Sequence, residues 1–188
     1  MRVAGKGLVD RSQPISFSFD GAKVRGFAGD TVASALLAND LRLVGRSFKY
    51  HRPRGIWSAG SEEPNALVTV GSWAGKEPNV RATVLELRHG LKTFSQNAWP
   101  SLGFDLLGSN DLCAPFLGTG FYYKTFMWPR KFWELLYEPV IRRAAGLGAL
   151  GQEAGKGRVE KAFAFCDLLV IGAGPSGLMA ALTAGRAG

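Results

Sequence analysis

Cysteine is scarce in this sequence, which excludes several classes of metal and disulfide protein. Cys113 and Cys166 are the two cysteines among 188 residues, and they lie far apart. Since neither belongs to a CxxC motif, the sequence predicts neither a zinc site nor a disulfide framework. We therefore expect no metal site and a reducing, cytoplasmic setting.

Long apolar runs are missing as well. Residues 1–14 have no apolar core of the kind that marks a signal peptide, and no run of about 18 apolar residues occurs. Hydrophobic residues still make up 46% of the chain, which is enough to bury a core. The composition therefore predicts a soluble folded protein that does not associate with membranes.

Positive charge is concentrated in one stretch of the chain. The net charge is +8, and residues 41–60 contain five basic residues and no acidic one. A local basic patch of this kind favours a phosphate-bearing ligand or an acidic protein face. Binding to nucleic acid generally needs a broader basic surface, so we expect no nucleic-acid partner.

The first 90 residues have the pattern of a small α+β domain. Apolar and polar residues alternate over 15–19, and the turn dipeptide Asp20-Gly21 precedes a second such stretch, which predicts a β-hairpin. An N-cap within Gly29-Asp30-Thr31 predicts a helix that ends near Asn39. Further strands are expected at residues 41–44, 67–71 and 80–87.

Two segments of this domain have no periodic pattern. Residues 1–14 are expected to form a loose or docking arm. Residues 45–66 combine glycine, proline, serine and charged residues, and they predict a long irregular loop. A loop of this length within a compact domain usually carries a function.

Residues 91–150 differ in composition, since they are rich in aromatic residues, glycine and proline. One or two helices are expected within residues 132–146, with a break or kink at Pro139. The aromatic side chains either pack on the N-terminal domain or dock on another chain, and the sequence leaves both readings open. Residues 151–165 are rich in glycine and charge and predict a linker.

A dinucleotide-binding pattern follows. An apolar stretch at 168–171 precedes a turn with the spacing G-x-G-x-x-G, and a segment typical of a helix comes after it. In such a turn the first glycine permits a tight bend, the second lets the backbone approach a pyrophosphate, and the third lets helix and strand pack closely. The helix N-terminus then presents free N–H groups to phosphate. The predicted cofactor-binding residues are Gly172, Gly174, Pro175, Ser176 and Gly177.

The pattern stops before it is complete. A βαβ unit spans about 30 residues or more, whereas 22 residues run from Asp167 to Gly188. The second strand is missing, as is the acidic residue about 20 positions beyond the glycines that would bind a ribose. We therefore expect this chain to be the front part of a longer protein.

Several longer segments are more specific than the glycine motif. They read RSFKYHRPRG, SAGSEEPNALV, QNAWPSLGFDLLGSNDL, GFYYKTFMWP, FWELLYEPVIRRAAGLG and VIGAGPSGLMAAL. From about residue 15 onward, the sequence resembles the α subunits of heterotetrameric sarcosine oxidases. The implied fold class is α+β. A ferredoxin-like β-grasp domain would span 1–90, an aromatic-rich connecting and docking segment with a linker 91–165, and the first strand–turn–helix of a Rossmann-type domain 166–188.

The resemblance implies a role in a multi-subunit flavoenzyme. Such enzymes oxidise sarcosine (N-methylglycine) to glycine and a one-carbon unit, formaldehyde or methylene-tetrahydrofolate, and form H₂O₂. NAD is implied for the α subunit, and FAD and FMN for the whole complex, with FMN between the α and β subunits. The implied partners are the β subunit, which carries the amine-oxidising flavin, and the smaller subunits. No catalytic residue is carried over, and the 188 residues alone are expected to be inactive.

Iron–sulfur ligands are missing from the loop in which relatives carry them. In ferredoxin-like domains of amine dehydrogenases, the loop after PRG contains cysteines that hold an iron–sulfur cluster. The three corresponding positions here are Ser58, Glu63 and Ala66. Because a cluster of this type needs cysteine thiolates, we expect no iron–sulfur cluster.

Arg52 and Arg54 are candidate cofactor-binding residues in the basic stretch. Guanidinium groups suit phosphate oxygens, so this stretch would face a cofactor phosphate, or else the β subunit. The alternative is a solvated loop. His51 is expected at the surface, and Glu62 and Glu63 could pair with the two arginines.

Two other functions remain open at this point. One is a non-catalytic β-grasp interaction module that docks on a partner subunit. The other is the α subunit of a related amine or opine-type dehydrogenase. Titration with NAD separates an interaction module from a fragment that holds a working cofactor site.

Overall fold

A computed structural model describes residues 2–3, 6–7, 9–71, 75–116, 118–121, 126–144 and 161–188. The chain divides into two units, Met1–Gly155 and Lys156–Gly188, which are described separately. None of the helices formed by these residues has both the length and the apolar character needed to cross a membrane.

The predicted hairpin is confirmed. Strands β1 (Asp10–Phe19) and β2 (Ala22–Ala28) pair antiparallel, with Phe17 opposite Val24. The turn between them has left-handed backbone angles at Asp20 and Gly21, with φ values of 49° and 83°, and turns of this kind match the twist of the strands they join. Since β1 begins at Asp10, the arm expected over residues 1–14 is wrong for residues 10–14.

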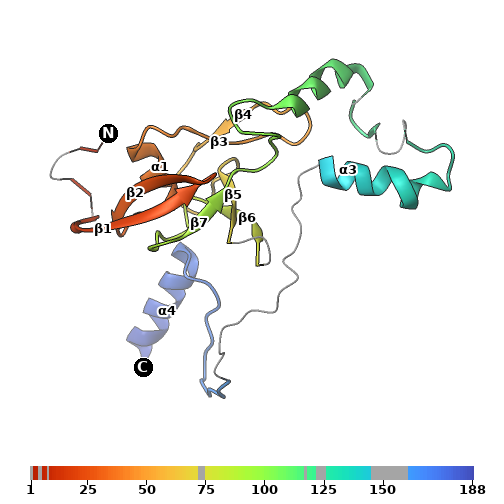
Figure 1. Cartoon of the computed structure of the whole chain (residues 1–188). Coiled ribbons are helices and arrows are strands. Elements are labelled where there is room, and N and C mark those ends of the chain that lie inside the picture. The colour runs from red at the N-terminus through yellow and green to blue at the C-terminus, as the bar shows by residue number, and fades with distance from the viewer. Residues whose placement is uncertain are drawn as a thin grey trace. The chain divides into compact units, whose positions relative to one another are not determined.

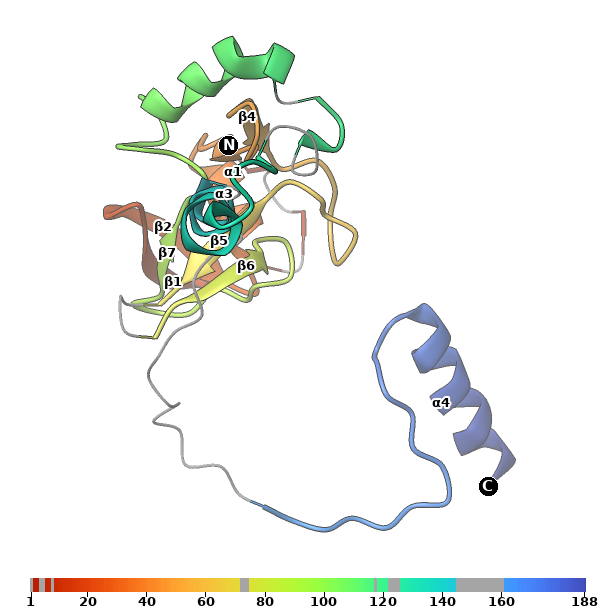
Figure 2. The same cartoon turned by 90° about the vertical axis from the view of Figure 1, so that its right-hand side faces the viewer.

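Five strands form one mixed sheet in the order β2-β1-β7-β5-β6 (Figures 1 and 2). Strand β7 (Lys92–Phe94) lies in the centre, parallel to β1 and antiparallel to β5 (Leu67–Val70). Strand β6 (Glu77–Arg81) pairs with β5 at the edge. Because β7 has only three residues, no periodic pattern predicted it. Since β7 lies after residue 90, the sheet extends beyond the boundary expected for the β-grasp domain.

A second, two-stranded sheet lies within the segment expected to be an irregular loop. Strand β3 (Leu43–Arg46) confirms the strand expected near 41–44, and it pairs antiparallel with β4 (Pro53–Gly55). The expectation for residues 45–66 is therefore wrong for β4 and for residues 45–46, which belong to β3. The rest of that stretch has no helix or strand, as predicted.

The predicted helix is present as α1 (Val32–Ala38). Thr31 is its N-cap, since the Thr31 hydroxyl accepts from the Ser34 N–H and the Ser34 hydroxyl accepts from the Thr31 N–H. This reciprocal pair satisfies two backbone donors that the helix itself leaves free. Asn39 ends the helix, and its side-chain amide donates to the carbonyl of Ala35 at 2.7 Å.

The strand expected at 80–87 is wrong beyond Arg81, because the chain turns there toward the start of α1. The N–H groups of Val32 and Ala33 donate to the carbonyls of Leu85 and Ala82, both at 2.9 Å. The first N–H groups of a helix have no partner within the helix. In this chain carbonyls within residues 82–87 bind these N–H groups, so the segment does not continue the strand that its sequence favours.

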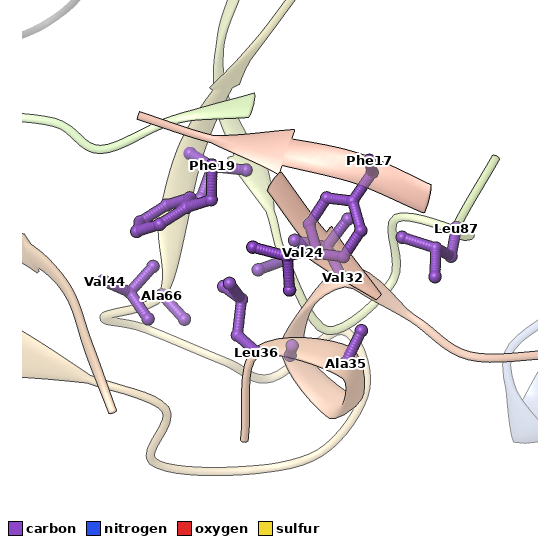
Figure 3. Close-up of a cluster of buried hydrophobic side chains, with 12 residues drawn as sticks. Phe17, Phe19, Val24, Val32, Ala35, Leu36, Val44, Ala66 and Leu87 are labelled. Atoms are coloured by element: carbon purple, nitrogen blue, oxygen red, sulfur yellow. The ribbon is translucent and has the colours of Figure 1, made fainter. Parts of the chain in front are cut away.

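The core lies between α1 and one face of the sheet (Figure 3). Leu36 and Ala35 of α1 point toward Phe17, Phe19 and Val24 of the hairpin. A single helix packed across a five-stranded sheet in this order is a β-grasp arrangement, which agrees with the predicted α+β class. The buried hydrophobic side chains are Phe17, Phe19, Val24, Val32, Ala33, Ala35, Leu36, Val44, Ala66, Val68, Ala82 and Leu87.

The aromatic segment contains helical turns with few buried side chains. A 3₁₀ helix, η1, spans Leu106–Phe116 and has no buried residue. A π-helical turn, η2 (Trp133–Tyr137), leads into α3 (Glu138–Ala144). Pro139 has no N–H to donate to the preceding turn, and the irregularity expected at this residue is present as the change from π to α geometry.

The second unit consists of an extended segment and one helix. Residues 161–173 have no regular secondary structure, so the strand expected at 168–171 is wrong. Strands of a parallel sheet require neighbours, and the described residues of this unit supply none. Helix α4 (Pro175–Ala187) confirms the helix expected after the glycine motif, but it begins within the motif, with Gly174 as its N-cap. Of the predicted linker, residues 151–160 lie outside the described residues.

Replacing Leu36 by alanine tests the core. Leu36 is fully buried, whereas its neighbour Leu37 on the same helix is 45% exposed. We expect Leu36→Ala to lower the free energy of unfolding by about 2–5 kcal/mol, because it leaves a cavity. Urea denaturation followed by circular dichroism measures this. The matched variant Leu37→Ala should change stability by less than about 1 kcal/mol, and equal losses in the two variants would contradict the assignment of the core.

Candidate functional site

One buried carboxylate organises the loop that precedes β5. The side chain of Glu63 is buried, with 1% of the residue exposed. One of its oxygens, Oε2, accepts from the backbone N–H groups of Trp57 and Ser58 at 2.8 and 2.6 Å. The other, Oε1, accepts from those of Asn65 and Ala66 at 2.7 and 3.1 Å. The loop thus wraps around a single acidic group.

The environment keeps Glu63 ionised. Burial raises the pKa of a carboxyl group, but four N–H donors favour the charged form more strongly. The net effect is a pKa for Glu63 below its usual value of 4.5. No ion pair involves Glu63 among the described residues, so the expected pairing with Arg52 or Arg54 is wrong. Glu62, also expected to pair with them, is exposed, and its carboxylate lies 3.5 Å from the Ser61 hydroxyl.

A basic pocket lies beside this loop. It has a volume of about 410 Å³ and is lined by residues of 45–54, 64–67 and 96–97. Among the described residues, no acidic side chain lines it. The four cationic residues in its lining are Arg46, Lys49, Arg52 and Arg54.

Three of these cations form no ion pair with any described residue. Lys49 and Arg52 both lie against the ring of Tyr50, with 4.8 and 5.0 Å from the charged atom to the ring centroid. Arg54 donates to the side-chain oxygen of Asn65 at 3.1 Å. Contacts with rings and amides orient the cations without neutralising them. The pocket therefore suits a negatively charged group.

The fourth cation, Arg46, belongs to a buried network that joins the basic stretch to the segment after β7. Its guanidinium donates to the carbonyls of Leu102 and His51 at 3.0–3.1 Å. His51 Nδ1 lies 2.8 Å from the Asp105 carboxylate, and both side chains are 1% exposed. Asp105 also accepts from the N–H groups of Trp99 and Leu107.

This network overturns the expectation that His51 lies at the surface. The residue is buried, and its backbone has a positive φ of 52°. Its Nε2 atom has no hydrogen-bond partner among the described residues. Sequence reasoning could not link His51 to Asp105, because 54 positions separate them and neither belongs to a periodic pattern.

The glycine-rich turn was predicted as a cofactor site, and two of its glycines have steric reasons to be glycine. Gly172 has a φ of 111°, which residues with side chains rarely adopt. A Cβ atom on Gly177 would lie 2.1 Å from the carbonyl oxygen of Gly172. Around Gly174 a Cβ would meet nothing within 4 Å. Pro175 and Ser176 form the first turn of α4, beside this open backbone.

The predicted site residues therefore lie in two different units of the chain. Arg52 and Arg54 line the pocket of the first unit, and the glycine turn lies in the second unit. Among the described residues, no group of three or more His, Cys, Asp or Glu side chains could hold a metal ion. Sequence reasoning missed the role of Glu63, since nothing in the residues around it indicates four convergent N–H groups.

Comparison with known families and proteins supplies three findings. The family model described as "2Fe-2S iron-sulfur cluster binding domain" matches residues 12–98. Sarcosine oxidase subunit alpha of Rhizobium meliloti (strain 1021) is 66% identical over 187 residues, which is 100% of this chain and 19% of that protein. Sarcosine oxidase subunit alpha of Corynebacterium sp. (strain U-96) is 33% identical over 183 residues, 96% of this chain and 14% of that protein. The chain thus spans less than a fifth of the length of either relative.

A solved structure also matches part of the chain. The crystal structure of L-proline dehydrogenase from P. horikoshii aligns with a TM-score of 0.38 and 23% identity, and the match covers 46% of this chain and 16% of that one. At this TM-score the likeness carries no further argument.

Replacing Asp105 by alanine tests the buried network. The change removes the partner of His51 Nδ1 and leaves two backbone N–H groups without an acceptor. We expect the free energy of unfolding to fall by about 2 kcal/mol or more. Asp111→Ala is the matched control, because Asp111 is exposed. If the two variants unfold at the same urea concentration, the network does not hold residues 99–107 against the basic stretch.

Proposed function

We propose that this chain, which belongs to the family of sarcosine oxidase α subunits, forms part of the α subunit of a multi-subunit flavoenzyme. The reaction would be the oxidation of sarcosine to glycine and a one-carbon unit, formaldehyde or methylene-tetrahydrofolate, with formation of H₂O₂. The observation that carries the proposal is the 66% identity over 187 residues with a sarcosine oxidase subunit alpha. We assign no catalytic residue to this chain.

Subunit contact is one contribution of this part. Large apolar side chains between residues 99 and 140 are exposed in the first unit, including Leu112 at 85%, Trp128 at 84% and Leu135 at 78%. Exposed apolar side chains at this density are typical of surfaces that another protein covers. For these residues the exposure favours docking on another chain over packing on the β-grasp domain. The chain that covers them would be another subunit of the oxidase.

The start of an NAD site is the second contribution. Gly174 leaves open backbone at the N-terminus of α4, where free N–H groups favour a pyrophosphate. The close approach of Gly177 to Gly172 fits the role of the third glycine in a dinucleotide-binding turn. The second strand and the acidic residue for the ribose would come from elsewhere in the subunit.

The basic pocket is the third contribution. Arg52 and Arg54 line an acid-free pocket and have no carboxylate partner among the described residues. We propose that these two arginines bind the phosphate of a cofactor that lies between subunits, and FMN is the candidate. FAD would be on the β subunit.

A substitution at Gly177 tests the NAD site in the assembled oxidase. In Gly177→Ala the new Cβ would clash with the Gly172 carbonyl, and the turn must open. Overpacking of this kind costs about 1–3 kcal/mol, so NAD should bind roughly tenfold more weakly. The NAD released on denaturation is measured per complex. Gly185→Ala lies on the same helix with open space around it and should retain NAD. Full NAD content in Gly177→Ala would count against this site.

A double substitution tests the basic pocket. Arg52→Ala with Arg54→Ala removes two guanidinium groups, and hydrogen bonds to charged groups contribute about 1.5–3 kcal/mol each. Flavin absorbance per assembled complex should therefore fall, while the NAD content stays constant. The control is Arg42→Ala, since Arg42 is exposed and pairs with Asp40. Unchanged flavin in the double variant would remove Arg52 and Arg54 from the cofactor site.

A further inference from the structure

We propose that residues 57–66 form a loop of the iron–sulfur type in which the carboxylate of Glu63 occupies the place of the cluster. The loop's backbone N–H groups, which would otherwise face an anionic cluster, converge on this one acidic side chain. The inference concerns the first unit alone and is independent of the enzymatic activity proposed above.

Spacing supports the assignment. A [2Fe–2S] cluster of the plant type is bound by cysteines spaced C-x₄-C-x₂-C, with a fourth cysteine further along the chain. Ser58, Glu63 and Ala66 have this spacing, within the range that matches the 2Fe-2S family model. None of the three side chains can act as a thiolate ligand.

The structure also indicates the fourth position. Thr83 is nearly buried, and its hydroxyl donates to the carbonyl of Gly60, within the loop, at 2.5 Å. The N–H of Ala82 donates to the carbonyl of Ala66 at 2.9 Å. Residue 83 therefore lies against the loop, although it is far from it in sequence. All four positions are occupied by residues other than cysteine, so the residues present do not fit a cluster.

The N–H groups explain why an acidic residue suits the loop. Successive N–H groups that point into a concave turn form an anion site, and iron–sulfur clusters accept such hydrogen bonds through their sulfurs. In this chain the four N–H groups from both ends of the loop point inward and reach one carboxylate at 2.6–3.1 Å. Without an acceptor at this place these partly buried donors would lose their partner, which costs free energy.

Charged neighbours do not supply the stabilisation. Arg81 of β6 donates to the backbone carbonyl of Glu63 rather than to its side chain. Arg54 of β4 donates to Asn65, and Glu62 is exposed. The carboxylate therefore depends on the four backbone N–H groups and on a longer contact of 3.4 Å with the Ser58 hydroxyl, and donors alone around it favour a group with negative charge.

The first experiment measures the unfolding of the 188-residue chain in urea. Glu63→Ala should raise the equilibrium constant for unfolding at least tenfold, and Glu63→Gln should raise it less, since the amide retains one acceptor. Glu62→Ala and Glu62→Gln are the matched controls and should change it less than about threefold. If Glu63→Ala unfolds as the Glu62 controls do, the carboxylate does not hold the loop and the proposal fails.

The pH dependence of the same measurement follows from the lowered pKa of Glu63. A carboxyl group with a lowered pKa stabilises the folded state above its ordinary value, and this contribution is lost as the pH falls through the lower folded value. The difference between the wild-type chain and Glu63→Gln should therefore be full at neutral pH and shrink below about pH 4.5. A constant difference from pH 7 to pH 3 would contradict the role of charge.

The second experiment distinguishes a loop with the geometry of a cluster site from an ordinary loop that a buried acid stabilises. It uses a background in which Cys113 and Cys166, both exposed, are replaced by serine. The chain is incubated anaerobically with ferrous iron and sulfide, and visible absorption and electron paramagnetic resonance detect a [2Fe–2S] cluster. The background should bind none, and the variant with Ser58→Cys, Glu63→Cys, Ala66→Cys and Thr83→Cys should acquire one.

Each result of the second experiment has a definite meaning. A cluster on the background chain would overturn the proposal, because the loop would then not be filled by Glu63. A folded four-cysteine variant that assembles no cluster would overturn the equivalence of the four positions. The unfolding measurements decide the role of Glu63 by themselves if the four-cysteine variant does not fold.

Discussion

Four backbone N–H groups that converge on the carboxylate of Glu63 hold the least regular part of the β-grasp domain in place. Nearly every buried backbone group in a folded protein needs a partner, and a segment without helix or sheet must find other acceptors. A single ionised side chain meets this need for both ends of the loop. Strand β5 begins directly after the loop, so the central pairing of the sheet starts from a fixed position.

The same requirement accounts for other features of the first unit. Residues 82–87 leave the sheet because the carbonyls there satisfy the first N–H groups of α1. Arg46 and Asp105 tie the segment after β7 to the basic stretch through backbone groups as well as through His51. The cations of the pocket, at residues 46–54, thus lie on a stretch that this network holds in place. In the proposed oxidase that stretch would offer positive charge to a cofactor phosphate.

Sequence reasoning succeeded where a short-range pattern decides the structure. The Asp20-Gly21 turn, an N-cap within residues 29–31 and a helix after the glycine motif each depend on neighbouring residues, and the structure confirms all three. It failed where long-range partners decide. The strand expected at 168–171 lacks neighbours among the described residues, β7 is defined by its place in the sheet, and the burial of His51 depends on a residue 54 positions away. Glu63 was recognised as a departure from cysteine, but its hydrogen bonds could not be foreseen.

The central claim is that an ionised carboxylate stands where a cluster loop would hold its cofactor. The most direct measurement is a titration of the Glu63 side-chain carboxyl by carbon-13 nuclear magnetic resonance, with Glu62 as the internal reference. The account predicts that Glu63 remains ionised to a pH below its ordinary pKa of 4.5, and that the amide protons of Trp57, Ser58, Asn65 and Ala66 shift when it finally protonates. A carboxyl group that titrates at or above 4.5, without a response from those amides, would contradict it.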